Sequence, residues 1–287
     1  MEKKNTGNLG KKIAYYSLIG VFGLVFLCSA LYIGNYLLKS GEANNAYENL
    51  DSYRDQIMAT MPSRPKPTDP KPPQTDPSTG ETLPPATAAP EPTAPGGMLI
   101  EQYPFYEMNN DMVGWITIPD TKVNYPVMQT PDKKDYYLKR NFDKMWSDWG
   151  AIYANEKADI NLPSDNITLY GHHMKDGSMF AGLDKFKKQA FWEDHQTFYF
   201  DTLYERHTYK IWAVFKTSAN LDQGFPYHNF VDAANEEEFN EFVSTVKQLQ
   251  FYETGYTPEF GEKLLTLSTC EYSLDNGRFV VCAVRVD

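Results

Sequence analysis

An uncharged, apolar run from Ile13 to Leu38 is the feature that most limits how this chain can fold. It is long enough to cross the roughly 30 Å hydrocarbon core of a bilayer as one helix. It exceeds an ordinary signal-peptide core and lacks a clear small-x-small cleavage site, which favours an uncleaved anchor over a cleaved signal. Residues 1–12 carry the lysines Lys3, Lys4, Lys11 and Lys12. We therefore expect a single-pass protein of the cell membrane, with a cytoplasmic N-terminus and an extracellular chain after Lys39.

The chain after the predicted anchor (13–38) divides by composition into three parts. Residues 39–61 are predicted to form a polar juxtamembrane helix, because their apolar residues recur at helical spacing. Residues 62–97 are mainly Pro, Thr and Ala, and they cannot bury enough apolar surface to fold. We expect a disordered, partly polyproline linker with a reach on the order of 100 Å, which would lift a domain off the membrane. Residues 98–287 have a globular composition and are expected to form one folded domain.

Charge and cysteine content argue against two broad classes of protein. The net charge of -11 and the pI near 5.0 disfavour a nucleic-acid partner, because phosphate binding needs a basic face. The chain has three cysteines, Cys28, Cys270 and Cys282, too few for a disulfide framework. Cys28 lies inside the apolar run. Cys270 ends one predicted strand and Cys282 lies within the next, so strand register disfavours a disulfide between them.

Short strands separated by turn residues dominate residues 98–287. Apolar and β-branched runs predict strands at 113–118, 123–128, 150–153, 166–170, 197–200, 208–217, 264–270 and 279–286. Helical spacing predicts short helices at 99–109 and 179–186. A longer helix is predicted at 235–249, where three glutamates near the start suit the helix dipole. The pattern is typical of a mainly β fold, either a barrel or a sandwich.

A thiol ends one predicted strand, and a guanidinium opens the next. The strand at 264–270 alternates large apolar with small polar residues and ends at Cys270, and the segment 271–277 has the composition of a turn. Arg278 then begins the following strand. Cys270 and Arg278 are therefore expected at the same edge of a sheet. This arrangement suits a nucleophile, because a thiolate is the attacking species and an adjacent cation favours it.

Two of the five histidines directly follow a predicted strand. His172 and His173 come after Gly171, where the chain leaves the strand at 166–170, and active groups often lie on such loops. Either is a candidate acid–base partner for Cys270. No zinc-binding motif accompanies the pair, and neighbouring residues on extended chain point in opposite directions, so we expect no metal or cofactor. The other histidines, expected at the surface or in hydrogen bonds, are His195, His207 and His228.

Several motifs together resemble the sortases, the cysteine transpeptidases of Gram-positive cell surfaces, and class B most closely. The resemblance centres on Thr266–Cys270 with Arg278, and on Tyr170–Met174 upstream. Supporting motifs are Asn110–Ile116, Tyr125–Val127, Tyr136–Leu138 and Lys175–Phe180. The predicted helix at 235–249 also has the position of a class B helix. The resemblance covers residues 98–287 and implies a mainly β fold, the eight-stranded sortase-type β-barrel with short accessory helices.

The resemblance also implies a role for each candidate residue. Cys270 matches the nucleophile, His172 its acid–base partner and Arg278 the cation beside the oxyanion. His172 is favoured over His173 because the histidine of the family directly follows the glycine. The candidate substrate-binding residues beside them are Ser268, Thr269, His173 and Glu271. We expect substrate choice to depend on the segment between the strands at 208–217 and 264–270.

A class B resemblance implies substrates that are surface proteins with a C-terminal Pro-x-Thr-type sorting signal. The signal is cleaved after Thr through a Cys thioester and joined to an amine of a cell-wall peptide, in lipid II or peptidoglycan. Two alternatives stay open: a pilin-polymerising transpeptidase with a pilin lysine as acceptor, and a catalytically silent surface scaffold. A papain-like peptidase fits less well, because its cysteine begins a helix. Pro72–Asp76 in the linker itself resembles such a signal and raises a pseudo-substrate hypothesis, although chance matches are common in proline-rich sequence.

Overall fold

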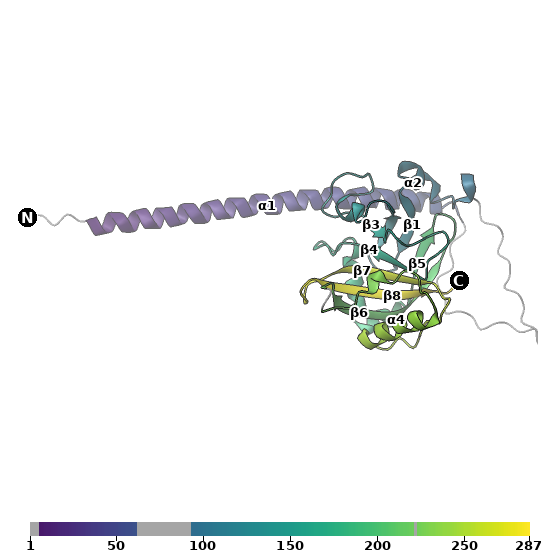
Figure 1. Cartoon of the computed structure of the whole chain (residues 1–287). Helices are drawn as coiled ribbons and strands as arrows, with labels where there is room; N and C mark the ends of the chain where they lie inside the picture. The colour runs from purple at the N-terminus through teal and green to yellow at the C-terminus, as the bar shows by residue number, and fades with distance from the viewer. Residues whose placement is uncertain (1–5, 62–92, 221–222) are drawn as a thin grey trace, which may run out of the picture. The chain divides into compact units, whose positions relative to one another are not determined.

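The computed structural model describes residues 6–61, 93–220 and 223–287 (Figure 1). The chain forms two compact units, Met1–Asn49 and Leu50–Asp287. The second unit contains all the strands of the described residues and all the predicted catalytic residues. The fold that matters for chemistry is therefore that of the second unit.

The predicted anchor and the polar segment after it belong to one continuous helix, α1 (Thr6–Met58). Within α1, Lys11–Met58 is long and apolar enough to cross a membrane, and no other helix of the described residues meets that test. The large apolar side chains between Ile13 and Leu38 are exposed, except for Tyr36, which is half-buried. Most of the predicted linker, including the Pro72–Asp76 motif, lies outside the described residues.

Eight strands close into a barrel in the order β1-β2-β3-β4-β7-β8-β6-β5. Neighbouring strands are antiparallel, except for the parallel pairs β2–β3 and β4–β7. The strands are β1 (Met112–Thr117), β2 (Asn124–Met128), β3 (Ile152–Ala154), β4 (Asn166–Tyr170), β5 (Thr197–Thr202), β6 (Thr208–Ser218), β7 (Leu264–Glu271) and β8 (Gly277–Arg285). The closed barrel confirms the mainly β prediction and decides for a barrel over a sandwich.

Short helical segments connect the strands. They are η1 (Pro95–Gly97), α2 (Tyr103–Met108), η2 (Tyr136–Lys139), η3 (Phe180–Lys187), α3 (Gln189–Asp194), η4 (Tyr227–Asn229) and α4 (Glu236–Leu249), where η marks a 3₁₀ helix. Sequence spacing predicted helices at the places of α2, η3 and α4. The others were not predicted, because such short segments contain too few residues to display a helical period.

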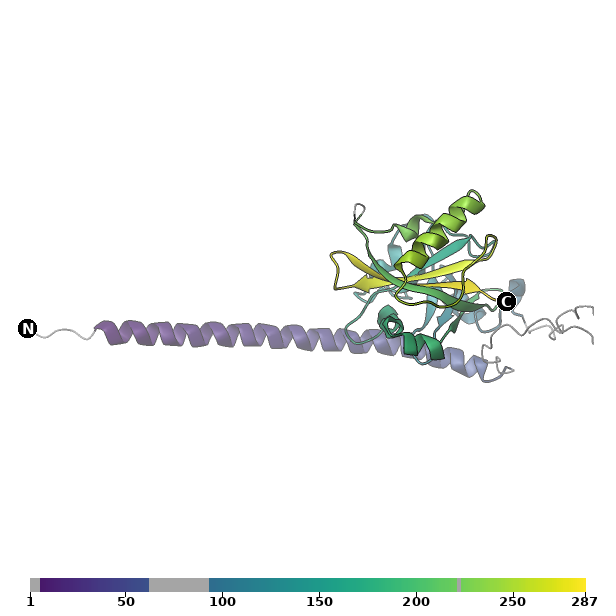
Figure 2. The ribbon, with the colours of Figure 1, turned by 90° about the horizontal axis from the view of Figure 1, so that it is seen from below.

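The helix α4 lies across the outside of the barrel (Figure 2). Its N-cap is Asn235, whose side-chain oxygen accepts a hydrogen bond from the amide of Glu238 at 3.0 Å. The buried face of α4 packs on side chains of β6, β7 and β8, and this cluster includes Phe239, Phe242, Val243, Val246, Phe215, Leu264, Val280, Cys282 and Val284. Burying each large side chain contributes about 1.5–3 kcal/mol. The cluster therefore holds the three strands firmly together beneath α4.

Candidate active site

The pairing of β4 with β7 brings distant parts of the chain to one end of the barrel. The two strands are parallel, with Tyr170 opposite Ser268. Because parallel strands run in the same direction, His172 and Cys270, each two residues further on, lie at the same rim. The antiparallel strand β8 places Arg278 directly opposite Cys270. The three residues predicted to act together therefore meet at one rim.

These three residues line a single cleft of about 300 Å³. Two of the predicted substrate-binding residues, Ser268 and Thr269, line it as well. The remaining lining comes from several loops and strand ends: Lys134, Asp135, Leu138, Tyr153, Tyr170, Gly171, Ala219, Tyr227 and His228. Three of these, at positions 219, 227 and 228, belong to the segment on which sequence analysis predicted substrate choice.

The imidazole of His172 is held by the backbone of the 3₁₀ helix η2. Its Nε2 atom lies 2.7 Å from the carbonyl oxygen of Leu138. A carbonyl only accepts hydrogen bonds, so Nε2 carries a hydrogen and donates it, which leaves Nδ1 to exchange a proton. Burial lowers the pKa of His172 from its ordinary 6.5, and it outweighs the opposite effect of the Leu138 carbonyl. The imidazole is therefore neutral at pH 7.

The residue before His172 must be a glycine because the backbone there is closely packed. The amide of Gly171 donates to the carbonyl of Ser268 at 3.1 Å, and its carbonyl accepts from the Thr269 hydroxyl at 2.8 Å. A Cβ atom on Gly171 would lie 2.5 Å from Cδ1 of Ile152, which is too close for any real contact. Thr269 and Gly171 thus tie the loop of His172 to the strand of the thiol.

The guanidinium of Arg278 is held at the turn between β7 and β8. Its Nη1 atom donates to the carbonyl oxygens of Asn276 and Gly277 and to the side-chain oxygen of Asn276, at 2.9–3.1 Å. Cys270, its partner across the hairpin, is a free and partly exposed thiol. Cys282 is also free, but it is buried and lies opposite Thr266. The register therefore keeps the two thiols apart, as predicted.

Tyrosine side chains form one wall of the cleft. The hydroxyl of Tyr227 lies 2.6 Å from Oγ of Ser268, and burial raises the pKa of Tyr227 to about 12. Tyr153 donates to Asp135 at 2.9 Å, and its ring contacts that of Tyr170 with a centroid separation of 5.3 Å. These hydroxyls stay protonated at physiological pH. The wall is therefore aromatic and uncharged, and its hydroxyls are held in place by hydrogen bonds.

His228 is a cleft residue that sequence analysis did not predict. It lies in η4, and burial lowers its pKa, with Lys134 and Arg278 among the cations that act in the same direction. Its place in a loop with Pro226 and Asn229 gave no sign of this position, and sequence analysis expected it at the surface or in hydrogen bonds. The available signal was its place in the segment predicted to govern substrate choice. By contrast, His195 and His207 form hydrogen bonds outside the cleft, as predicted.

Two predicted substrate-binding residues, His173 and Glu271, belong to a chain of polar contacts beside the cleft. His173 pairs with Asp184 at 3.0 Å, and Lys187 pairs with Asp184 at 2.9 Å and with Glu271 at 3.7 Å. Neither residue is part of the cleft lining. Their contacts link the loop after His172 with the end of β7. A substrate-binding role for them stays a prediction.

A thiol, an imidazole and a guanidinium around one cleft at the rim of a closed barrel define a class of cysteine enzyme built for acyl transfer. The family model described as "Sortase domain" matches residues 116–286. The chain belongs to the sortase family, the cysteine transpeptidases.

Similar proteins come from class B of this family. Sortase B of Listeria monocytogenes is 33% identical over 177 residues, which are 61% of this chain and 70% of that protein. Sortase B of Staphylococcus aureus is 30% identical over 181 residues, 62% of this chain and 71% of that protein. A crystal structure of a Bacillus anthracis protein described as similar to sortase B has a TM-score of 0.61 at 33% identity, and the match covers 69% of this chain and 87% of that one. A Staphylococcus aureus sortase B–substrate complex shares the fold, with a TM-score of 0.68 at 22% identity over 87% of this chain and 99% of that one.

Proposed function

We propose that this class B enzyme is a membrane-anchored transpeptidase that cleaves a Pro-x-Thr-type sorting signal after the threonine. It joins the released surface protein to an amine of a cell-wall peptide, in lipid II or peptidoglycan. The observation that carries this proposal is the convergence of Cys270, His172 and Arg278 on one cleft. The roles of nucleophile, acid–base and oxyanion cation follow from the chemistry of these three side chains.

The first step is attack by Cys270 on the carbonyl carbon of the threonine. His172 is neutral because burial lowers its pKa, so its Nδ1 atom accepts the thiol proton as the sulfur–carbon bond forms. The hydrogen bond from Nε2 to Leu138 persists in the imidazolium that results. This bond keeps the ring oriented and favours its charged form.

The second step is collapse of the tetrahedral intermediate. Negative charge on the former carbonyl oxygen is stabilised by the guanidinium of Arg278. The carbon–nitrogen bond after the threonine breaks, and the departing amine takes the proton from Nδ1 of His172. The threonine carbonyl is then joined to the sulfur of Cys270 as a thioester.

An acceptor amine resolves this thioester. The amine attacks the thioester carbon and gives its proton to His172, a new amide bond forms, and the sulfur leaves and recovers the proton as the Cys270 thiol. Each half of the reaction exchanges one bond to the carbonyl carbon for another, so it needs neither an oxidant nor a reductant. If water takes the place of the amine, the outcome is hydrolysis.

The aromatic wall of the cleft supports a proline-containing signal. Extended proline-rich segments dock well on aromatic grooves, because the proline chain is already ordered before binding. Tyr153, Tyr170 and Tyr227 offer such a surface within the same cleft as Cys270. The hydroxyl of Tyr170 accepts a hydrogen bond from Asn155 at 3.2 Å, so its own hydrogen can be donated to a backbone carbonyl of a bound peptide.

The proposal includes a single-pass anchor, with the N-terminus in the cytoplasm and the barrel outside the cell. The apolar span in α1 supports it, as do Lys11 and Lys12 on the side expected to be cytoplasmic. Our assignment of 1–12 as a basic segment, 13–38 as the membrane span, 39–61 as a juxtamembrane helix and 62–97 as a linker belongs to the same proposal.

The direct test is mass spectrometry of the detergent-solubilised full chain incubated with a panel of Pro-x-Thr peptides and no amine. We expect an acyl adduct on Cys270 with the mass of the fragment ending in threonine. The Cys270→Ala variant must lack the adduct, and Cys282→Ala must retain it. Absence of an adduct across the panel would favour the silent scaffold instead.

The acceptor can be identified by competition. Supplying a wall-peptide amine and a lysine-containing pilin peptide at equal concentration should give mainly the wall-peptide product. Preferential transfer to the lysine side chain would replace the proposed acceptor with that of a pilin polymerase, while leaving the thioester chemistry intact.

A further inference from the structure

The guanidinium of Arg278 is held at one end by two residues at the β7–β8 turn, Asn276 and Gly277. Nη1 of Arg278 donates to both oxygens of Asn276, the backbone carbonyl and the side-chain Oδ1, each at 3.1 Å. A third contact, to the carbonyl of Gly277, is 2.9 Å long. These contacts all engage Nη1, and the rest of the guanidinium carries further donors. The turn thus fixes one end of the planar group that lines the cleft.

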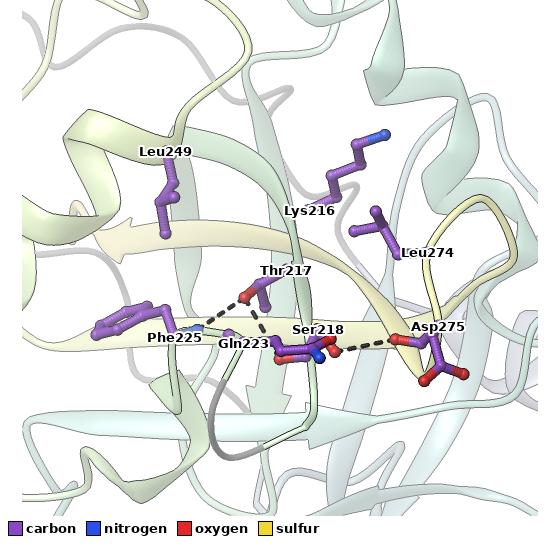
Figure 3. Close-up of a pocket in the computed structure, with 9 residues that line it drawn as sticks. Lys216, Thr217, Ser218, Gln223, Phe225, Leu249, Leu274 and Asp275 are labelled. Carbon is purple, nitrogen blue, oxygen red and sulfur yellow. Dashed lines mark hydrogen bonds between the residues drawn. The ribbon is translucent and has the colours of Figure 1, made fainter.

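Asn276 is itself tied to the end of β6. Its side-chain amide donates to Oδ1 of Asn220 at 3.2 Å, and its carbonyl accepts from the amide of Ala219 at 2.9 Å. Asn220 in turn donates to Oδ2 of Asp275 at 3.0 Å. The hydroxyl of Ser218 donates to the carbonyl of Asp275 at 2.9 Å (Figure 3). The turn and the strand end therefore form one hydrogen-bonded unit.

The backbone of Asn276 has a second requirement. Its φ is +48°, in the left-handed region that asparagine and glycine adopt more readily than other residues. Asparagine meets this requirement and also supplies a side-chain acceptor at Arg278, whereas glycine would meet only the first. This difference makes the two roles of the residue experimentally separable.

We propose that Asn276 is a positioning residue for Arg278, supported by Asn220. A guanidinium on a flexible side chain stabilises an oxyanion best when its orientation is fixed before the reaction, because ordering it during the reaction costs entropy. The three contacts at Nη1 supply that order and leave the other donors to the cleft. This inference rests on the oxyanion role of Arg278 in the proposed function.

The first test is Asn276→Gly, which keeps the left-handed backbone and removes the acceptor. We expect kcat to fall about 5- to 10-fold with KM nearly unchanged, the effect of losing one hydrogen bond to a charged group at a partly exposed site. Asn276→Asp keeps an acceptor and tolerates the same backbone, so it should restore most of kcat. Asn220→Ala should lower kcat in the same direction but less.

A matched control lies in the same turn. The hydroxyl of Ser273 donates to Glu271 at 2.8 Å and accepts from Lys216 at 3.1 Å, and neither contact involves the guanidinium of Arg278. Ser273→Ala should therefore have the turnover of the unaltered enzyme. Thermal unfolding of every variant shows whether the turn remains folded. A loss of kcat in Ser273→Ala equal to that in Asn276→Gly would mean that any disturbance of the turn suffices, and would overturn the proposal.

A double-mutant cycle separates positioning from a purely structural role. If Asn276 acts through the guanidinium, Asn276→Gly should change nothing further in an Arg278→Ala background, measured as the rate of thioester formation. An equal fold-loss in both backgrounds would overturn the positioning role. If Arg278→Ala alone has unaltered turnover, both the proposed role of the arginine and this inference are wrong. If Arg278→Ala has reduced turnover but Asn276→Gly has unaltered turnover, only this inference is wrong.

Discussion

The rim and the middle of the β7–β8 hairpin each carry a thiol on the same face of the sheet. The thiol at the rim is accessible, and the thiol in the middle is buried. At the rim, Cys270 lies opposite Arg278, and further along the hairpin Thr266 lies opposite Cys282. Cys270 is partly exposed and lines the cleft, whereas Cys282 is 1% exposed and burial raises its pKa to about 12. The comparison teaches that covering the middle of the hairpin and leaving its rim open makes Cys270 accessible to a substrate and keeps Cys282 inaccessible.

The cover over the middle of the hairpin is α4. Cys282, Val280 and Leu264 belong to the cluster that α4 closes, together with Tyr227. Tyr227 also lines the cleft, so it lies at the border between the covered and the open part of the same face. The thiol beneath α4 packs as an apolar side chain, whereas the thiol beyond α4 is accessible and is the nucleophile of the proposed function.

The largest effect should come from replacing the accessible thiol, Cys270, with alanine, and the same change at Cys282 is the matched control. Cys270→Ala should abolish transpeptidation, because no other side chain of the cleft can form the thioester. Cys282→Ala should keep turnover and cost only about 1–2 kcal/mol of unfolding free energy, the scale of a small buried substitution. Peptide cleavage assays and thermal unfolding check both. Loss of turnover in a folded Cys282→Ala variant would break the comparison.

The next largest effect should come from the cation at the rim. Arg278→Lys keeps the charge but loses the planar fork, and we expect kcat/KM to fall about 10²- to 10³-fold, the scale of a lost oxyanion donor. The matched control is Arg285→Lys at the far end of β8, outside the cleft lining. Equal rates for the two variants would contradict a special role for the rim.

A smaller effect should follow from Gly171→Ala. The added Cβ would lie 2.7 Å from Cγ of Phe180, a ring that is fully buried and has little room to move, so the loop of His172 must shift. We expect a loss of about 1–3 kcal/mol of unfolding free energy, as in overpacked cores, and a fall in turnover of about 10-fold from the displaced imidazole. Gly182→Ala, with its nearest atom at 3.2 Å, is the milder control. Unchanged activity and stability in Gly171→Ala would contradict the claim that close packing at this position fixes the loop of His172.

The smallest expected effect is a shift in the pH profile. Because burial lowers the pKa of His172 from 6.5, the imidazole stays neutral to lower pH than a free histidine. The acid limb of kcat/KM should therefore lie below pH 6.5, and activity should fall only as the pH drops through that lowered value. A pH–rate profile whose acid limb lies at or above pH 6.5 would show that the base at the rim is not the buried imidazole.

Sequence patterns predicted much of the rim but little of what surrounds it. The pairing of Cys270 with Arg278 was predictable, because both belong to one local hairpin whose turn residues are evident. The parallel pairing of β4 with β7 was not, because it joins segments far apart in the chain and local alternation says nothing about partners. The family resemblance, and not the spacing of residues, selected His172 as the partner of Cys270.

Loop residues were the hardest to place. His228 and Tyr227 reach the cleft through a short 3₁₀ turn, whose position depends on packing beneath α4 and not on local preference. His173 and Glu271 stand next to His172 and Cys270 in sequence, yet neither lines the cleft, and Asp184 and Lys187 contact them instead. A neighbour in sequence on extended chain points the other way, so adjacency in sequence alone could not show which side chains line the cleft.

The parallel ladder between β4 and β7 also has a consequence for the making of the enzyme. Thr269 and Gly171 bond across a sequence separation of 98 positions, and β7 and β8 are the last strands of the chain. The strand with the sulfur must insert beside β4, and the strand with the guanidinium must follow it, before the three groups can meet. Contacts of such high sequence separation slow folding, because the entropy of closing the intervening loop is lost before the contacts offset it. The proposed reaction therefore has no partly built form: until β7 has paired with both β4 and β8, the sulfur, the imidazole and the guanidinium cannot act on one substrate.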